Sequence, residues 1–178
     1  MLELGTKLPE FSLESVVDGT PFRSSSVAGK RGVLVMFICN HCPFVVHVRA
    51  KVVEVAHAAL DLGLAVVAIN SNSVRTHPQD GPGPMKELAK REGFRFPFLF
   101  DATQDVARAF DAACTPDFFV FDAEQRLVYR GQLDDARPGN GKPVTGRDLK
   151  AAIEAVAAGR PVSPEQRPSI GCNIKWDR

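Results

Sequence analysis

The 178-residue sequence lacks the features of membrane-spanning, nucleic-acid-binding and secreted proteins. No apolar run approaches the roughly 20 residues that cross a bilayer. The formal net charge is only +1, so no strong field would attract nucleic acid or an anionic membrane. Residues 1–7 lack the basic start and apolar core of a secretory signal, which favours a cytoplasmic location. We therefore expect no nucleic-acid partner and no membrane partner.

Cysteine is also scarce, and this scarcity argues against a disulfide-stapled scaffold. The chain has Cys39, Cys42, Cys114 and Cys172, which are too few and too unevenly spaced to staple a protein of this size. In a reducing compartment, such thiols are more often catalytic or metal-binding. The length and the 44% hydrophobic content predict a single domain over residues 1–178 with a core of its own.

Two apolar runs predict the centre of an α/β sheet. Residues 32–38 and 64–70 are nearly all apolar, as in strands that are covered on both faces. Between them, residues 40–60 carry apolar side chains at helical spacing. A strand, a helix and a second strand of these lengths form a βαβ unit, so the two strands should be parallel. The Pro- and Gly-containing loop over 71–84 follows the second strand and should lie near Cys39.

Shorter patterns predict the elements around this unit. The Asp18-Gly19 turn signal indicates a small N-terminal hairpin, and the proline-containing tail from residue 160 should be extended. That tail carries the only tryptophan, so we expect it to dock on the domain. The remaining predictions are helices over 85–91, 103–113 and 145–159, a strand over 97–100 and an antiparallel hairpin over 118–131.

The stretch Cys39-Asn40-His41-Cys42-Pro43 lies where the first strand gives way to the helix. Two thiols at Cys-X-X-Cys spacing beside a helix N-terminus favour reversible disulfide chemistry. Amide N–H groups of a first helical turn stabilise a thiolate, so we expect Cys39 to have a pKa below the ordinary value of about 8.5. The motif predicts a redox-active pair.

The order of these elements resembles the thioredoxin fold over nearly the whole chain, with a central mixed sheet flanked by helices. Residues 4–13 and 29–37 resemble the opening of the peroxiredoxin-related branch, of the alkyl hydroperoxide reductase and thiol-specific antioxidant type. Residues 39–45, 129–135 and 168–176 are similar to bacterial proteins described as thioredoxin-like or peroxiredoxin-like. The resemblance implies a thiol-disulfide oxidoreductase that needs no cofactor.

The resemblance also implies roles for individual residues. Cys39 would be the exposed nucleophile and Cys42 the resolving thiol, with Pro116 as the cis-proline opposite them. Thr115 and Pro116 would border the groove for a protein or small-molecule disulfide, and an external thiol would restore the reduced protein. Val33 stands about where thioredoxins place a buried aspartate that helps to move protons. The residues expected to modulate the site are Asn40, His41 and Pro43.

A peroxiredoxin-like peroxide reductase is the first alternative. It would use Cys39, with Cys42, Cys114 or Cys172 as the resolving thiol. Peroxiredoxins carry Pro-X-X-X-Thr-X-X-Cys, and neither Cys39 nor Cys42 is preceded by that threonine or proline. Just before the later strand, Thr115-Pro116-Asp117 replaces the arginine that peroxiredoxins carry there. The sequence therefore favours disulfide exchange over peroxide reduction.

A redox-sensing or metal-binding module is the second alternative. Cys39, His41 and Cys42 could bind a metal together with Cys172 or Cys114, but thioredoxin-fold copper chaperones use a Cys-X-X-X-Cys spacing, so no metal is expected. Cys114 is either a regulatory thiol or a small buried residue. Cys172 either resolves a disulfide of Cys39 from a tail folded over the groove or simply anchors that tail. Both questions stay open, as does the oligomeric state.

Overall fold

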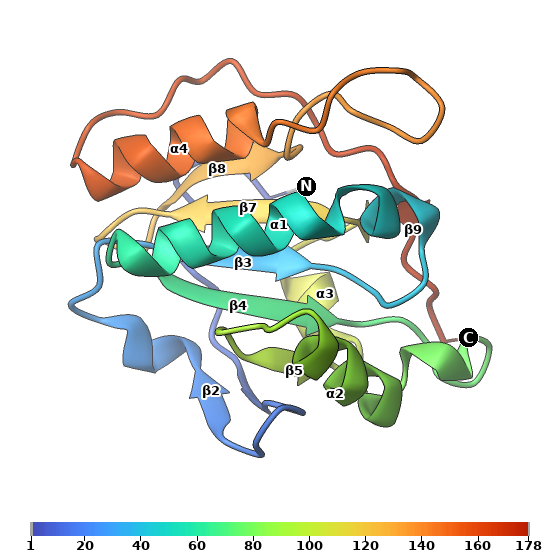
Figure 1. Ribbon diagram of the computed structural model, residues 1–178. Coiled ribbons are helices and arrows are strands. Elements are labelled where there is room, and N and C mark those ends of the chain that lie inside the picture. The colour runs from blue at the N-terminus through green and yellow to red at the C-terminus, as the bar shows by residue number, and fades with distance from the viewer. Residues whose placement is uncertain (1, 178) are drawn as a thin grey trace.

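The computed structural model describes residues 2–177 and is built on a five-stranded sheet with helices on both faces (Figure 1). Its regular elements in chain order are β1 (Ser12–Glu14), β2 (Pro21–Arg23), η1 (Ser24–Val27), β3 (Val33–Phe37), α1 (Pro43–Asp61), β4 (Ala65–Asn70), η2 (Pro78–Asp80), α2 (Pro82–Arg91), β5 (Phe98–Phe100), α3 (Asp105–Ala109), β6 (Cys114–Thr115), β7 (Asp117–Phe121), β8 (Leu127–Gly131), α4 (Arg147–Ala157) and β9 (Cys172–Asn173).

The central sheet has the strand order β5-β4-β3-β7-β8. Strands β3, β4 and β5 run parallel, whereas β7 and β8 are antiparallel to their neighbours. All five residues of β3 are buried, and their side chains alternate between two cores. Leu34 and Met36 pack on the side of α1 and α4, whereas Val35 and Phe37 pack on the side of α3. This confirms the expected mixed sheet with helices on both faces.

The βαβ unit and both predicted hairpins are confirmed. Strands β3 and β4 pair in parallel through the crossover helix α1, as the two apolar runs predict. The N-terminal hairpin is β1 with β2, and the later one is β7 with β8. Among residues 2–177, no helix is both long enough and apolar enough to cross a membrane.

Helix α1 begins at Pro43, three residues later than the pattern over 40–60 predicts. The ring of a proline clashes with a helical residue before it, so Cys42 adopts an extended conformation, with φ −60° and ψ 127°. Cys42 is therefore the N-cap of α1, and Cys39 lies in the connection between β3 and the helix. This shift changes the environments of the two thiols.

The other helices differ from prediction at their ends. Helix α2 begins three residues early at Pro82, because proline is tolerated in a first turn. Helix α3 ends at Ala109, four residues early, and Asp111 has a left-handed φ of 48° that no helix continues. Helix α4 begins two residues late at Arg147, because Gly146 is left-handed, with φ 69°.

The tail after α4 returns across the molecule to the end of the sheet that carries Cys39. It crosses over α4, and its strand β9 lies beside the start of α1 (Figure 1). There β9 pairs with β6, the two residues just before Pro116. The side chain of Ile174 is buried in the core on the α3 side of the sheet. The tail therefore contacts the candidate site directly.

Candidate active site

Cys39 and Cys42 form a reduced, buried pair of thiols between β3 and α1. Their exposed fractions are 0% and 2%. Each thiol shifts the pKa of the other, so the two sulfur atoms lie close enough to interact directly. Two thiols within hydrogen-bonding reach can be joined by a disulfide after modest movement.

The geometry favours the thiolate on Cys42. The hydrogen bond from Cys39 is the main cause that lowers the pKa of Cys42, and the amide of Val45 in the first turn of α1 lowers it further. The pKa of Cys39 is raised, first by its hydrogen bond to Cys42 and then by burial. The expectation of a low pKa for Cys39 is therefore wrong for this conformation. Because the helix starts at Pro43, the N-terminal position of α1 belongs to Cys42.

Thr115 and Pro116 lie against both thiols, and the peptide bond between them is cis. The hydroxyl Oγ1 of Thr115 is 3.4 Å from the Cys39 sulfur. The carbonyl oxygen of Thr115 is 3.7 Å from the Cys42 sulfur. The cis-proline predicted from the resemblance is thus present, and its neighbour Thr115 contacts the pair from the opposite side to α1.

Asp80 is a residue of the site that the sequence did not reveal. Its buried carboxylate accepts a hydrogen bond from the Asn40 amide N–H at 2.9 Å, and one from the Asn72 side chain at 3.0 Å. His41 Nδ1 lies 2.9 Å from Oδ2 of the same Asp80 carboxylate. The charge of Asp80 also raises the pKa of Cys39. Asp80 brings a carboxylate to the thiols from the 71–84 loop, in place of the strand position at Val33.

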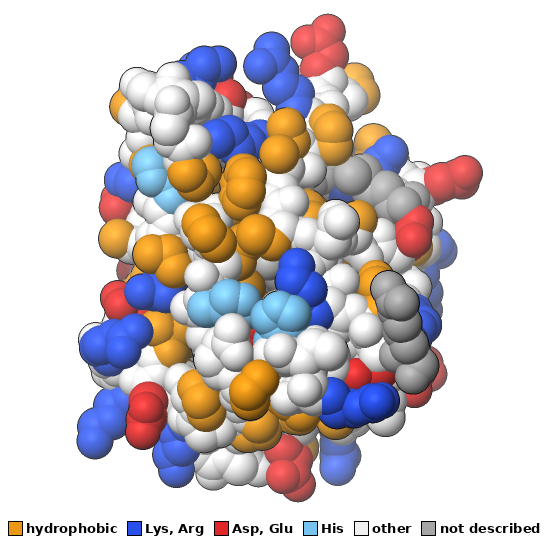
Figure 2. Space-filling model, turned by 90° about the vertical axis from the view of Figure 1, so that its right-hand side faces the viewer, with side chains coloured by type: hydrophobic (Ala, Val, Ile, Leu, Met, Phe, Trp, Pro, Cys, Tyr) orange, Lys and Arg blue, Asp and Glu red, His pale blue; other side chains and the backbone are white. Residues whose placement is uncertain are grey.

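His41 stacks on His77 from the same loop, with ring centroids 5.4 Å apart and an interplanar angle of 20°. Figure 2 shows adjacent histidine side chains at the surface of this end of the molecule, bordered by hydrophobic side chains. The imidazole of His41 is partly exposed, and it connects the buried Asp80 to the surface. The predicted modulators Asn40 and His41 therefore both contact Asp80.

The structure also identifies residues that could hold a metal ion. Within residues 2–177, one group of three ligand-type side chains has its ligand atoms within 4.8 Å of one another, namely Cys39, His41 and Asp80. The ligand set weighed from the sequence differs, because it contained further cysteines and not Asp80. The carboxylate oxygens of Asp80 already have protein hydrogen-bond partners in Asn40 and Asn72.

The two remaining cysteines lie at different distances from the chemistry. Cys172 lies close enough to Cys42 to lower the pKa of that thiol, and the backbone amide of Phe44 lowers the pKa of Cys172. Cys114 points elsewhere, with its sulfur 3.9 Å from the Pro116 carbonyl oxygen. Burial raises the pKa of Cys114 to about 12, so this thiol is poorly reactive. The structure therefore brings Cys172 to the pair through Cys42, and it leaves Cys114 as a small buried residue.

Asp117, the first residue of β7, is a second buried carboxyl beside the cis-proline that the sequence did not single out. Burial raises its pKa to about 6, although the nearby Ser169 hydroxyl and the backbone amides of Ala113 and Phe118 oppose that shift. Ser169 belongs to the tail, so this carboxyl contacts the segment that covers the site.

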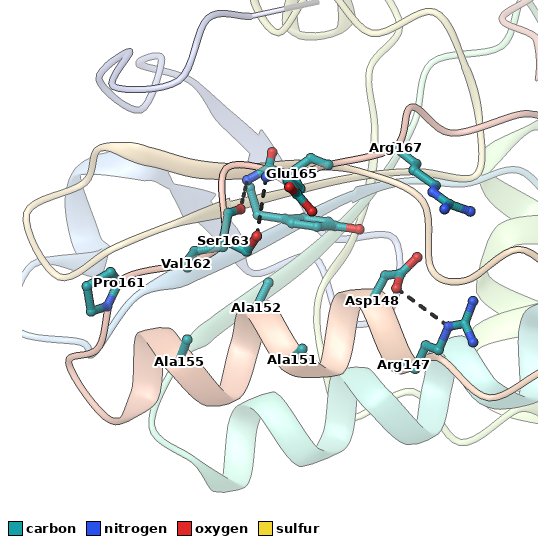
Figure 3. Close-up of a pocket in the computed structure, with 12 residues that line it drawn as sticks. Arg147, Asp148, Ala151, Ala152, Ala155, Pro161, Val162, Ser163, Glu165 and Arg167 are labelled. Atoms are coloured by element: carbon teal, nitrogen blue, oxygen red, sulfur yellow. Dashed lines mark hydrogen bonds and ion pairs between the residues drawn. The ribbon is translucent and has the colours of Figure 1, made fainter.

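A cavity lies away from the thiols, between α4 and the tail (Figure 3). Its volume is about 590 Å³, and its floor is formed by small side chains of α4, including Ala152 and Ala155. Tail residues 161–167 form the opposite wall. No cysteine lines this cavity, so it is separate from the candidate active site.

Comparisons with known proteins agree with this architecture. A sequence model of the Redoxin family matches residues 3–149. None of the curated proteins matches the chain. Among solved structures, an uncharacterized conserved protein from Geobacillus kaustophilus is 51% identical, with a TM-score of 0.96 over 99% of this chain and 94% of that one. A hypothetical protein from Sinorhizobium meliloti is 49% identical, with a TM-score of 0.96 over 99% and 96% of the two chains.

More distant structures share the fold. A thiol:disulfide interchange protein of the thioredoxin family from Chlorobium tepidum is 24% identical and has a TM-score of 0.66. The match covers 88% of this chain and 99% of that one. At this identity the likeness concerns the fold alone. It confirms the thioredoxin fold that the order of elements resembles.

Proposed function

We propose that this chain, which belongs to the Redoxin family, is a thiol-disulfide oxidoreductase whose redox centre is the pair Cys39 and Cys42. One observation carries the proposal: two buried thiols, one at the N-terminus of α1, both contact Thr115, the residue that precedes a cis-proline. Buried structural cysteines have no need of this mutual contact or of a helix terminus. The substrate would be a protein or small-molecule disulfide.

The proposed reaction begins at Cys42, whose thiolate is stabilised by Cys39 and by the first turn of α1. The Cys42 thiolate attacks one sulfur of the substrate disulfide, and the other sulfur leaves as a thiolate that takes a proton from water. The Cys39 thiol then loses its proton and attacks Cys42. This releases the second substrate thiol and leaves a Cys39–Cys42 disulfide, and two electrons have passed to the substrate. These roles reverse those implied by the resemblance.

Asp80 and His41 are the candidates for moving the proton of Cys39. Atoms of the three side chains lie within 4.8 Å of one another, and the imidazole of His41 extends from Asp80 toward solvent. The second step needs Cys39 as a thiolate, although its pKa is raised. A nearby carboxylate and imidazole can accept that proton and pass it outward. An external thiol reductant in a reducing compartment such as the cytoplasm would complete the cycle.

The test is reduction of insulin disulfides by the protein with dithiothreitol as the final donor. We expect Cys42→Ser to lose turnover, and the double variant Cys39→Ser with Cys172→Ser to lose turnover while accumulating a mixed disulfide on Cys42, identified by peptide mass spectrometry. Cys114→Ser is the matched control and should retain turnover. A Cys42→Ser variant that still turns over, with the mixed disulfide on Cys39, would contradict the assigned order. Hydrogen peroxide in place of insulin should be consumed slowly.

A further inference from the structure

The C-terminal tail fills the groove in front of the two thiols. Strand β9 pairs in antiparallel fashion with β6, so that Cys172 lies opposite Thr115, the residue before the cis-proline. The contact is close because the neighbouring residue is Gly171. A Cβ atom placed on Gly171 would lie 2.0 Å from the Thr115 carbonyl oxygen. Only a residue without a side chain allows the tail to lie this near.

The thiol of Cys172 points at the redox pair from this position. It lies close enough to Cys42 to lower the pKa of that thiol, and the backbone amide of Phe44, in the first turn of α1, lowers the pKa of Cys172 itself. Extended peptides bind sheet edges through backbone pairing, which presents alternate side chains to the site. Residues 170–173 therefore lie as an extended substrate with a central cysteine would lie.

The tail is anchored on both sides of this segment. On one side, the Ser169 hydroxyl donates to the Gly131 carbonyl at 2.6 Å. On the other side, Ile174 is 3% exposed, and the Lys175 carbonyl accepts hydrogen bonds from Ser73 and Gln104. Ile170, between the anchors, is 58% exposed. Further back, the cavity over α4 leaves a gap beneath residues 161–167 (Figure 3).

An external disulfide has no path to either thiol while the tail is seated. Cys39 and Cys42 are almost fully buried, whereas Cys172 is only half-buried. The sulfur that borders both Cys42 and the surface is thus the one carried by the tail. Access to the redox pair has to pass through Cys172 or through displacement of the tail.

We propose that residues 170–173 act as an intramolecular substrate and that Cys172 is a third redox thiol, which takes the disulfide from the Cys39–Cys42 pair. This inference rests on the proposed function, because the pair must first be oxidised by a substrate. Cys172 loses its proton to water, and its thiolate attacks the Cys42 sulfur. The Cys42–Cys172 bond forms as the Cys39–Cys42 bond breaks. The electron pair leaves on Cys39, which takes up a proton, so the exchange involves no net oxidation.

The exchange has two consequences for the reaction. It moves the disulfide to a half-exposed sulfur, where an external thiol reductant can attack it. It also locks the tail over Cys39 and Cys42 until that reductant arrives. The partner that reduces the protein therefore meets Cys172, and the substrate that oxidises it meets Cys42 only when the tail is displaced.

The first test oxidises the Cys39→Ser variant with oxidised glutathione and maps its disulfides by peptide mass spectrometry. Glutathione first forms a mixed disulfide with Cys42, and Cys172 then displaces it as reduced glutathione. We expect a Cys42–Cys172 disulfide in most molecules and little retained glutathione. The matched control, Cys39→Ser with Cys172→Ser, should keep glutathione on Cys42. Retention of glutathione on Cys42 in the single variant, with Cys172 free, would overturn the proposal.

The second test displaces the tail without touching a cysteine. Gly171→Ala places a methyl group against the Thr115 carbonyl, whereas Gly83→Ala in α2 places one in open space. We expect Gly171→Ala to raise the rate of iodoacetamide alkylation of Cys42 in the reduced protein by roughly tenfold or more, because local opening governs access to a buried group. Gly83→Ala should leave the rate unchanged. An unchanged rate in a folded Gly171→Ala variant would contradict a tail seated in the groove.

These outcomes separate the inference from the function beneath it. One outcome is that the wild-type protein forms a Cys39–Cys42 disulfide and reduces insulin, while Cys172 never joins Cys42 in the Cys39→Ser variant. That outcome retains the proposed function and refutes the role of Cys172 as a third redox thiol. Wild-type protein in which Cys39 and Cys42 never join loses the proposed function itself.

Discussion

Cys172 is paired through its backbone with Thr115, the residue that precedes the cis-proline, although 57 positions separate the two in the sequence. The pairing brings a third thiol to the N-terminus of α1. It also explains why both thiols of a Cys-X-X-Cys motif are buried at the end of a sheet, where substrates would be expected to enter. The C-terminal tail is thus as much a part of the site as the Cys-X-X-Cys motif.

The thiolate of Cys42 should persist well below neutral pH. Its main stabilising contact is the hydrogen bond from Cys39, so Cys39→Ala should raise the pKa of Cys42 toward the ordinary value near 8.5. Cys39→Ser retains a donor and should raise it less. Thiolate absorbance at about 240 nm, followed against pH, measures both shifts. Identical titration curves for the two variants would show that the hydrogen bond does not set the pKa.

Asp80→Asn should slow the second half of the reaction. The amide can still accept from the Asn40 N–H, but it cannot take a proton from Cys39. We expect the mixed disulfide on Cys42 to be resolved roughly ten- to a hundredfold more slowly, so that it accumulates during turnover. The effect should be largest below pH 7. Rapid-quench mass spectrometry measures the adduct. Normal resolution in the folded variant would remove Asp80 from the proton path.

Asp117 should make the protein less stable as the pH rises. Its pKa of about 6 lies above the unfolded value of 3.8, so the native state binds more protons between these values. The contribution of Asp117 to the free energy of unfolding is therefore largest below about pH 4. It falls by up to about 3 kcal/mol as the pH rises through 6. Asp117→Asn should remove this fall. Urea unfolding at pH 5 and pH 8 is the measurement, and a variant with the wild-type pH dependence would contradict the assignment.

Ile174 should hold the tail in place more than Ile170 does. Ile174 is buried in the core beside α3, and truncation of a buried isoleucine costs about 2–5 kcal/mol. We expect Ile174→Ala to lower the free energy of unfolding and to speed amide exchange over residues 170–176. The exposed Ile170 provides the matched control, since Ile170→Ala should leave the free energy of unfolding and the rate of amide exchange unchanged within error. Equal effects of the two substitutions would show that the anchor lies elsewhere.

The parts of the structure that depend on local pattern could be predicted from the sequence. The apolar runs in β3 and β4 and the periodicity of α1 predict the parallel unit, and the spacing of Cys39 and Cys42 locates the site. The start of α1 was also within reach, because Cys42 precedes a proline and is therefore biased away from helical angles. That bias assigns the helix terminus to Cys42.

The rest of the site depends on contacts between distant segments. Asp80 reaches His41 from a loop whose position could be expected but whose side-chain directions could not. The β6–β9 pairing involves two residues in each strand, too short for any alternation to reveal it. The role of Gly171 follows only from its approach to Thr115. Such contacts are set by the packed tertiary structure and leave no periodic signal.

The most direct test of the redox pair is to equilibrate the wild-type, metal-free protein across glutathione redox buffers, alkylate the free thiols and map every disulfide by peptide mass spectrometry. We expect a two-electron transition between roughly −120 and −270 mV. Every disulfide formed in this transition should join Cys42 to Cys39 or to Cys172, and Cys114 should stay reduced. Persistence of Cys42 as a free thiol across the whole range, or its exclusion from every disulfide found, would contradict the account.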